Sequence, residues 1–366
     1  MRVKLEDVCE RGSSNLKQSD IIDKTGEYPI YGAAGYIGNV DFYHQEKSYV
    51  AVVKDGAGIG RTTLHPAKSS AIGTMQYLLP KENVLPEYLC YVVRYMHLEK
   101  YFTGATIPHI YFKDYKNEEF NLDPLDQQGE IVEILGKVES IIETRRNELQ
   151  KLDELIKARF VEMFGNTVTN PLNWEEHRLD EYIIFLTSGS RGWSQYFVDK
   201  EDELFITIKN VKNNHIILDN IQYIKAPNNK EAERTKVKDG DLLISITADL
   251  GRTGVVDSYI AEKGAYINQH LSLVRLDMNR INPLYVSYFL ETESGKRQFE
   301  SKNQNGVKAG LNFNAIKSLK ILVPPLEVQE LYLEFVAQVD KSKAAVQKAL
   351  DETQLLFDSL MQEYFG

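Results

Sequence analysis

The chain has 366 residues, a hydrophobic fraction of 43% and a formal net charge of −10, so it is long enough for two or more domains with real cores. It has no run of about 18 apolar residues and no signal-peptide core at its start. We therefore expect a soluble, cytoplasmic chain.

The two cysteines, Cys9 and Cys90, lie in no metal-ligand or redox spacing, and we interpret both as buried thiols. No His/Cys cluster would hold zinc, so no metal is expected.

The negative charge is distributed unevenly along the chain. Segment 124–165 carries six basic and nine acidic residues, and segment 325–366 carries three and eight. Residues 1–123 and 166–324 are close to neutral. Acidic segments are poor DNA surfaces and reasonable protein-docking surfaces, so the charge pattern separates two kinds of surface.

Residues 1–123 are predicted to form a globular domain of mixed helices and strands. In chain order we expect a helical start at 5–9, a polar loop at 11–17, a strand-and-turn region at 28–39, an apolar strand at 48–54, a glycine-rich turn at 55–62, a helix at 86–101, a loop at 104–109 and a strand at 120–122.

The next segment, 124–165, occurs again at 325–366, and one shift of 201 positions aligns the two without a gap. Apolar residues recur in both at alternating steps of four and three. They are Ile131, Leu135, Val138, Ile142, Leu149, Leu152, Ile156 and Met163, then Val336, Val339, Val346, Leu350, Phe357 and Leu360. This spacing over nearly five heptads predicts a long helix with one apolar seam that requires a partner helix.

Polar residues interrupt the seam at Arg145 and Arg159 in the first copy and at Lys343 and Thr353 in the second. These positions are not equivalent under the shift. Each polar position in one copy thus corresponds to an apolar position in the other, which favours packing of the two copies on one another. The alternative is that each copy is an ordinary long helix on its own domain.

Residues 166–324 repeat the order of the first domain more loosely. The predicted elements are a helical turn at 178–181 that matches 4–7, a loop at 187–193, strands at 205–211 and 241–246, a turn ending at 251–253, a helix from 283, a loop at 306–313 and a strand at 321–324. The chain is therefore predicted to be an α/β (α+β) protein with an internal repeat. Its domains are 1–123, 124–165, 166–324 and 325–366.

Several short motifs strengthen this layout. They are Pro124-Leu125-Asp126-Gln127-Gln128 and Pro325-Leu326-Glu327-Val328-Gln329 at the helix heads, Phe164-Gly165-Asn166 before Asn173-Trp174 and Leu179, Gly251-Arg252-Thr253, and Ala265-Tyr266-Ile267-Asn268-Gln269. In their doubled order they resemble the specificity subunit of type I restriction–modification systems. The shorter first domain departs from an equal repeat.

The resemblance implies two globular target-recognition domains, separated by two helices that form an antiparallel coiled coil with pseudo-two-fold symmetry. Each domain would read half of a split double-stranded DNA target. Two adenine-N6 methyltransferase subunits would dock on the chain, and a restriction/translocase subunit can join. S-adenosylmethionine would bind the methyltransferase, so the chain itself is expected to be non-catalytic and to need no cofactor.

A 42-residue helix spans about 60 Å, and two readers see the same face of B-DNA when they lie roughly 34 Å apart. Because 1–123 and 166–324 differ in sequence, the half-sites should differ too. We therefore expect an asymmetric bipartite target with unread base pairs in the middle.

Direct readout needs polar side chains on loops, with Arg suited to guanine and Asn or Gln to adenine. The first-domain candidates are Arg11, Ser13, Asn15, Lys17, Lys54, Arg61, Thr62, His109 and Lys113. The second-domain candidates are Ser190, Arg191, Trp193, Lys209, Asn210, Arg252, Thr253, Gln269, His270, Lys308 and Asn312. For any single one of them, a solvated loop residue is the interpretation we favour.

Arg61 and Arg252 both follow a glycine in the same turn, where the backbone can approach phosphate. A tight turn beside an exposed arginine explains them as well. Gln128 and Gln329 fit helix capping as readily as partner contacts. For Trp174 and the aromatic residues at 28, 31 and 36, core packing is favoured over base stacking.

The rival hypotheses are a specificity subunit of a related type II-like restriction–methylation enzyme, a catalytic chain, and a two-domain scaffold that binds no DNA. An adenine methyltransferase needs a polar residue before Pro-Pro-aromatic, whereas the chain has only Val323-Pro324-Pro325-Leu326. The glycine-rich stretch 55–60 is a weak cofactor signal because no fitting helix follows. Asp114-Tyr115-Lys116 lacks the upstream acidic partner of a nuclease site. These absences favour an adaptor.

Overall fold

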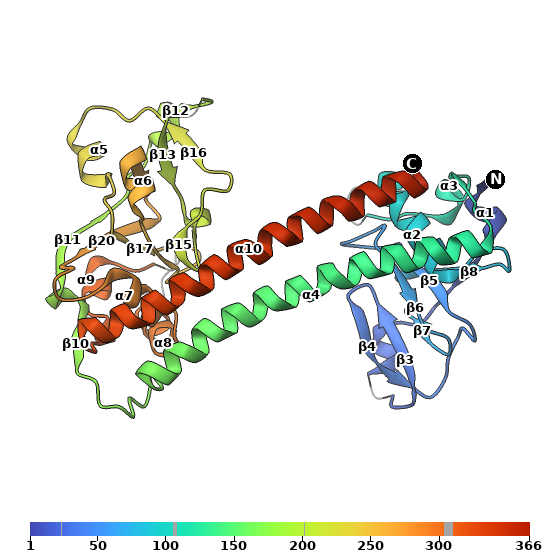
Figure 1. Ribbon diagram of the computed structural model, residues 1–366, viewed down its shortest axis with the longest axis horizontal. Coiled ribbons are helices and arrows are strands. Elements are labelled where there is room, and N and C mark those ends of the chain that lie inside the picture. The colour runs from blue at the N-terminus through green and yellow to red at the C-terminus, as the bar shows by residue number, and fades with distance from the viewer. Residues whose placement is uncertain (23, 105–107, 201, 304–309) are drawn as a thin grey trace. The chain divides into compact units, whose positions relative to one another are not determined.

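The computed structural model describes residues 1–22, 24–104, 108–200, 202–303 and 310–366 (Figure 1). The chain forms two compact units, of which unit 1 comprises residues 1–149 and 345–366 and unit 2 comprises residues 150–344. Both boundaries lie inside long helices, α4 (Leu125–Phe164) and α10 (Leu326–Phe365). Each unit therefore contains a globular part and a piece of each long helix. The predicted mixed fold with two long helices is confirmed.

Among its described residues, the globular part of unit 1 has three small sheets. A four-stranded antiparallel sheet has the order β2 (Cys9–Ser13), β8 (Met75–Pro80), β5 (Tyr49–Val53), β6 (Thr62–His65). A second sheet has the order β4 (Gly35–Val40), β3 (Tyr28–Gly32), β7 (Ser70–Ala71), and β1 (Arg2–Lys4) pairs with β9 (Glu119–Asn121). The helical segments are α1 (Leu5–Val8), η1 (Gln18–Ile21), α2 (Pro86–Tyr95), η2 (Leu98–Tyr101) and α3 (Phe112–Tyr115).

Helix α2 links the central sheet of unit 1 to the long helices. Its residues 88–93 are all buried and belong to the same apolar cluster as Val50 and Val52 of β5. Ile131 and Leu135 of α4 and Phe365 of α10 belong to this cluster too. The main core of unit 1 is therefore shared by sheet, α2 and long helices, which fixes the sheet against the helices.

Unit 2 is larger, and the part of it that the structure describes has two main sheets. The six-stranded sheet has the order β11 (Ile183–Ser188), β20 (Leu271–Leu276), β17 (Leu242–Ser245), β18 (Thr253–Val255), β15 (Asn214–Ile216), β14 (Val211–Lys212). The four-stranded sheet has the order β12 (Phe197–Val198), β16 (Gln222–Ile224), β13 (Glu203–Ile206), β19 (Ala265–Ile267), and β10 (Glu176–Arg178) pairs with β21 (Lys320–Leu322). The helical segments are η3 (Leu179–Glu181), η4 (Trp193–Tyr196), η5 (Ile208–Asn210), α5 (Lys230–Thr235), α6 (Ser258–Lys263), α7 (Pro283–Leu290), α8 (Glu293–Lys302) and α9 (Phe313–Lys317).

Helix α7 has in unit 2 the place that α2 has in unit 1. Tyr285 of α7 packs edge-on against Phe164 of α4, with ring centroids 5.0 Å apart, and Phe164 lies 5.4 Å from the ring of Tyr332 of α10. Aromatic rings in such edge-to-face contacts add stability beyond the area they bury. The two units therefore use equivalent helices to attach their sheets to the long helices.

Within each unit the pieces of α4 and α10 run antiparallel and contact each other. In unit 1, Arg145 donates hydrogen bonds to the carbonyl of Ala349 and the hydroxyl of Thr353. In unit 2, the Nζ of Lys343 lies 2.6 Å from a carboxylate oxygen of Asp153. The expected packing of the two copies on each other is therefore found within each unit, and the antiparallel direction places Arg145 beside Thr353, where they bond.

The predicted seam is buried to different degrees along the helices. The buried members are Ile131, Leu135, Val138, Ile142, Ile156, Val336 and Val339, and the half-buried ones are Leu149, Leu152, Met163, Val346, Leu350, Phe357 and Leu360. Towards the C-terminal end of each helix the buried positions shift one residue later, to Phe160 and Phe164 in α4 and to Met361 and Phe365 in α10. A straight helix with 3.6 residues per turn drifts from a 3.5-residue repeat, which accounts for the shift.

Three expected elements differ from the prediction. The polar loop at 11–17 is wrong at its start, because residues 9–13 form β2, whose backbone bonds come from β8. The strand expected at 205–211 ends at Ile206, since the Asn210 side chain accepts hydrogen bonds from the amide and hydroxyl of Thr207 and closes a turn. The helix expected at 86–101 ends at Tyr95, and His97 adopts a left-handed conformation with φ 51°.

Candidate nucleic-acid interface

In unit 1, part of the predicted DNA-binding set meets where strand β5 ends. The turn after β5 pairs with residues 108–110, through bonds from Ile110 N to Lys54 O at 2.9 Å and from Gly56 N to Pro108 O at 3.0 Å. Asp55 Oδ1 and His109 Nδ1 lie 2.6 Å apart. The fold therefore brings Lys54 and His109 together, although they are far apart in sequence.

Other unit 1 candidates lie near this end of β5. The Nζ of Lys113 lies 5.3 Å from the ring centre of Tyr111, whose ring stacks 6.4 Å from that of His109. The loop that carries Asn15 and Lys17 joins from the other side, where Gly73 N bonds to Leu16 O at 2.7 Å and Lys54 N bonds to Thr74 O at 3.0 Å. Arg11 and Ser13 lie on β2 instead.

The Gly-Arg-Thr turns have equivalent backbones but different side-chain partners. Gly60 and Gly251 have φ angles of 80° and 81°, a region that disfavours side chains. The Nη1 of Arg61 bonds to Ala33 O at 3.0 Å, whereas Arg252 pairs with Asp249 in its own turn. Each guanidinium thus has a partner within the chain. The threonines that follow, Thr62 and Thr253, are buried.

In unit 2, an arginine that sequence reasoning missed holds the predicted reading loop. Arg234 of α5 bonds through Nη1 to Ser188 O at 2.7 Å and through Nη2 to Ser190 Oγ at 3.0 Å, and it also bonds to the hydroxyl of Thr187. Arg191 follows this anchored segment and is exposed. The sequence signal that could have drawn attention to this short helix is Asn229, whose side chain caps the start of α5.

Two unit 2 candidates point into the protein rather than out of it. Trp193 is 5% exposed and packs against the rings of Phe205 and Tyr266, with centroids 5.5 and 5.3 Å away. Asn210 is 3% exposed and closes the turn η5. Both side chains therefore have structural roles, and the interpretation of Trp193 as a surface contact does not fit its burial.

The remaining unit 2 candidates are scattered. His270 Nδ1 lies 2.6 Å from the hydroxyl of Thr247, and its Nε2 lies 2.9 Å from the amide nitrogen of Gln269. Lys209 is exposed, and Asn312 caps α9 by accepting a bond from Ala315 N at 2.8 Å. Lys308 lies outside the described residues.

The helix-head glutamines are structural. Gln128 is fully buried, its Oε1 accepts from Leu85 N at 2.9 Å, and its Nε2 donates to the carbonyls of Asn83 and Asp123 at 3.0 and 2.8 Å. Gln329 repeats this with Asn282 N and Pro324 O. A fully buried amide with protein partners has no group left for a partner subunit.

Core packing, which was favoured for Trp174 and the tyrosines at 28, 31 and 36, holds for some of these residues and not for others. Trp174 is partly buried and its Nε1 donates to Phe164 O at 3.2 Å, and Tyr28 and Tyr31 are half-buried. Tyr36 is 61% exposed, so core packing was wrong for this residue. Its hydroxyl donates to Asn39 Oδ1 at 3.1 Å, and its ring lies edge-on to that of Tyr31.

Burial shifts the pKa of His65 and of both cysteines. Burial lowers the pKa of His65 to about 4, and burial raises the pKa of Cys9 to about 12 and that of Cys90 to about 11. Both cysteines are buried free thiols, as predicted. In the part of the chain that the structure describes, no group of three or more His, Cys, Asp or Glu side chains is arranged to hold a metal ion. No helix among the described residues has an apolar stretch suited to crossing a bilayer.

Comparisons with known proteins place this fold. The solved S subunit of a type I restriction–modification system from M. genitalium superposes with a TM-score of 0.64, covering 100% of this chain and 96% of that one, at 15% identity. This likeness shows the fold. The type I restriction enzyme EcoBI specificity subunit of Escherichia coli is 19% identical over 294 residues, which are 72% of this chain and 61% of that protein. A relative from Methanocaldococcus jannaschii is 22% identical over 53% of this chain and 46% of its own length.

The matched regions thus span about half to three fifths of these curated relatives. A family model described as "Type I restriction modification DNA specificity domain" matches residues 1–154 and 171–353, one match in each half of the chain. The chain therefore belongs to the family of type I restriction–modification DNA specificity domains.

Proposed function

We propose that the chain is the non-catalytic DNA-recognition subunit of a restriction–modification complex, and that its two globular parts each read one half of a bipartite double-stranded DNA target. The observation that carries this proposal is the double match to a DNA specificity domain, since 1–154 and 171–353 are matched separately. Two domains with different loops call for two different half-sites. The target should therefore be asymmetric.

The loops that differ between the units support this proposal. Unit 1 presents Lys54, His109 and Lys113 beside a glycine-rich turn, whereas unit 2 presents Arg191 on a segment anchored by Arg234. Cations and amides on loops suit phosphate contacts and the edges of bases. Because the sets differ in residue type and position, they are suited to different base sequences.

Catalysis would belong to partner subunits. In this proposal two adenine-N6 methyltransferase subunits bind the chain and carry S-adenosylmethionine, and a restriction/translocase subunit can join. The acidic long helices support this arrangement, because they suit protein docking better than DNA. The chain then needs no cofactor of its own.

The test is to express the chain with a type I methyltransferase subunit and to map N6-methyladenine across the host genome. We expect methylation at one asymmetric motif with a fixed unread gap, and none when this chain is omitted. A palindromic or continuous motif would contradict reading by two unlike domains. Binding of S-adenosylmethionine by the isolated chain at micromolar levels would contradict the adaptor role.

A further inference from the structure

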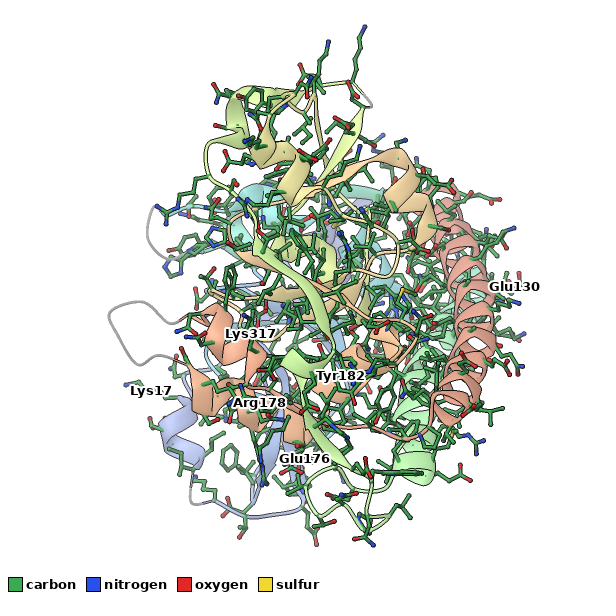
Figure 2. All side chains as sticks on the ribbon, turned by 90° about the vertical axis from the view of Figure 1, so that its left-hand side faces the viewer. Lys17, Glu130, Glu176, Arg178, Tyr182 and Lys317 are labelled. Carbon is green, nitrogen blue, oxygen red and sulfur yellow. The ribbon has the colours of Figure 1, made fainter. Side chains whose placement is uncertain are left out.

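Unit 2 contains a pocket of about 540 Å³ between β10, η3 and α9. Its polar lining comprises Arg178, Asp180, Lys302, Asn312, Asn314 and Lys317, together with Ser318. Three of its lining residues are cations and one is an acid. Figure 2 shows Arg178 and Lys317 on the face of unit 2 that is turned to the viewer. The pocket therefore has an excess of positive charge on an open face.

The acid in the pocket is already engaged. Asp180 accepts bonds from Nε and Nη2 of Arg178 at 3.1 and 2.9 Å. Lys302 Nζ donates to Ser318 Oγ at 3.0 Å. These contacts hold the pocket walls together and leave its excess charge in place.

Lys317 is the cation that is left free. Its side chain is exposed and makes no hydrogen bond, ion pair or ring contact with any residue in the described ranges. Nor does the side chain of Asn314, which is also exposed, bond to a described residue. An ammonium and an amide without acceptors at one pocket suit an anionic ligand that offers several oxygens.

Unit 1 provides an internal comparison. Under the shift of 201 positions Lys116 of unit 1 corresponds to Lys317, and Glu6 takes the place of Asp180 in the matching helical turn. Lys116 Nζ lies 2.7 Å from Glu6 Oε2. The lysine in unit 1 is thus neutralised by the acid, whereas in unit 2 Arg178 occupies the acid. A structural ion pair explains Lys116 and does not explain Lys317.

We propose that this pocket binds a phosphate of the DNA backbone, with Lys317 as its charged contact and Asn314 as a second donor. This inference rests on the proposed function, since it assumes that unit 2 meets DNA. Phosphate contacts position a protein on DNA without reading its sequence. Lys317 therefore sets how tightly unit 2 holds the duplex, not which bases it selects.

The experiment measures binding of the full chain, together with its methyltransferase partner, to a duplex without the target motif. Fluorescence anisotropy is recorded between about 50 and about 200 mM salt. We expect Lys317→Gln to weaken binding about 3- to 10-fold and to reduce the slope of log affinity against log salt by about 0.9. Lys317→Arg should retain both values, and the methylated motif should not change.

Lys116→Gln is the matched control, because it removes the same charge where it is already paired, and it should leave affinity and slope unchanged. Equal losses in Lys116→Gln and Lys317→Gln would mean a general charge effect and would overturn the pocket. Wild-type binding by Lys317→Gln would also overturn it, while the proposed function would stand. If the wild-type complex bound no duplex at any salt, both proposals would fall.

Discussion

Replacing Gln128 by methionine tests whether the helix head anchors the globular part of unit 1. Methionine has a similar length but can neither accept the bond from Leu85 N nor donate to the carbonyl of Asp123. A buried polar group that loses its partner costs about 1–3 kcal/mol. The carbonyl of Asn83, which also accepts from Gln128, is left out of this sum because it belongs to an exposed residue that water can reach. Two orphaned groups therefore predict a loss of about 2–6 kcal/mol.

The assay is urea unfolding followed by circular dichroism and by tryptophan fluorescence. Both tryptophans, Trp174 and Trp193, lie in unit 2, so fluorescence reports on that unit alone. With a urea slope of about 1–3 kcal/mol/M, Gln128→Met should lower the midpoint of the dichroism transition by about 1 M or more. The fluorescence transition should respond instead to Gln329→Met.

The control is Gln127→Met, at the exposed residue one position earlier. It should change the free energy of unfolding by less than about 0.5 kcal/mol. If Gln128→Met and Gln127→Met unfold at the same urea concentration, the buried amide contributes nothing and the anchoring role is refuted. Slower exchange of the Leu85 amide in the variant would refute it independently.

Three further predictions concern the long helix and the buried titratable groups. Four residues inserted near Asn147 of α4 should change the length of the unread gap in the methylated motif, and an unchanged gap would reject the helices as spacers. Cys9 and Cys90 should resist iodoacetamide at about pH 8 until urea unfolds the chain, since burial raises the pKa of each thiol above its usual range; rapid labelling of the native protein would refute this. His65 is neutral in the folded state down to about pH 4, whereas the unfolded chain protonates it at its ordinary pKa near 6.5. Stability should therefore fall by about 2–3 kcal/mol as the pH drops from about 6.5 to about 4, and His65→Gln should flatten that fall; an equal slope in the variant would contradict it.

The long helices were predictable because their signal is local and periodic. Steps of four and three between Ile131, Leu135 and Val138 specify a helix face without knowledge of the rest of the chain. The pairing of Arg145 with Thr353 was not predictable in the same way, because it depends on the direction in which two distant segments meet.

The globular parts show the same limit. Strand β2 has a mostly exposed, polar sequence, and its partner β8 lies far along the chain, so local composition resembled a loop. Trp193 looked like a surface residue because its packing against Phe205 and Tyr266 is not visible in the loop sequence. Asn210 looked like one because its hydrogen bonds to Thr207 and Ile217 depend on how the chain turns. The meeting of Asp55 with His109 and the role of Arg234 also depend on contacts between separate segments.

The central claim is that the two globular parts recognise different halves of the DNA target. Mapping the methylated motif of a chimaera tests it most directly. In this chimaera, residues 166–324 are replaced by the corresponding domain of another family member, while 1–165 and 325–366 are kept. We predict that one half of the methylated motif changes, and that the other half and the unread gap persist. A motif that stays the same, or one in which both halves change, would contradict the account.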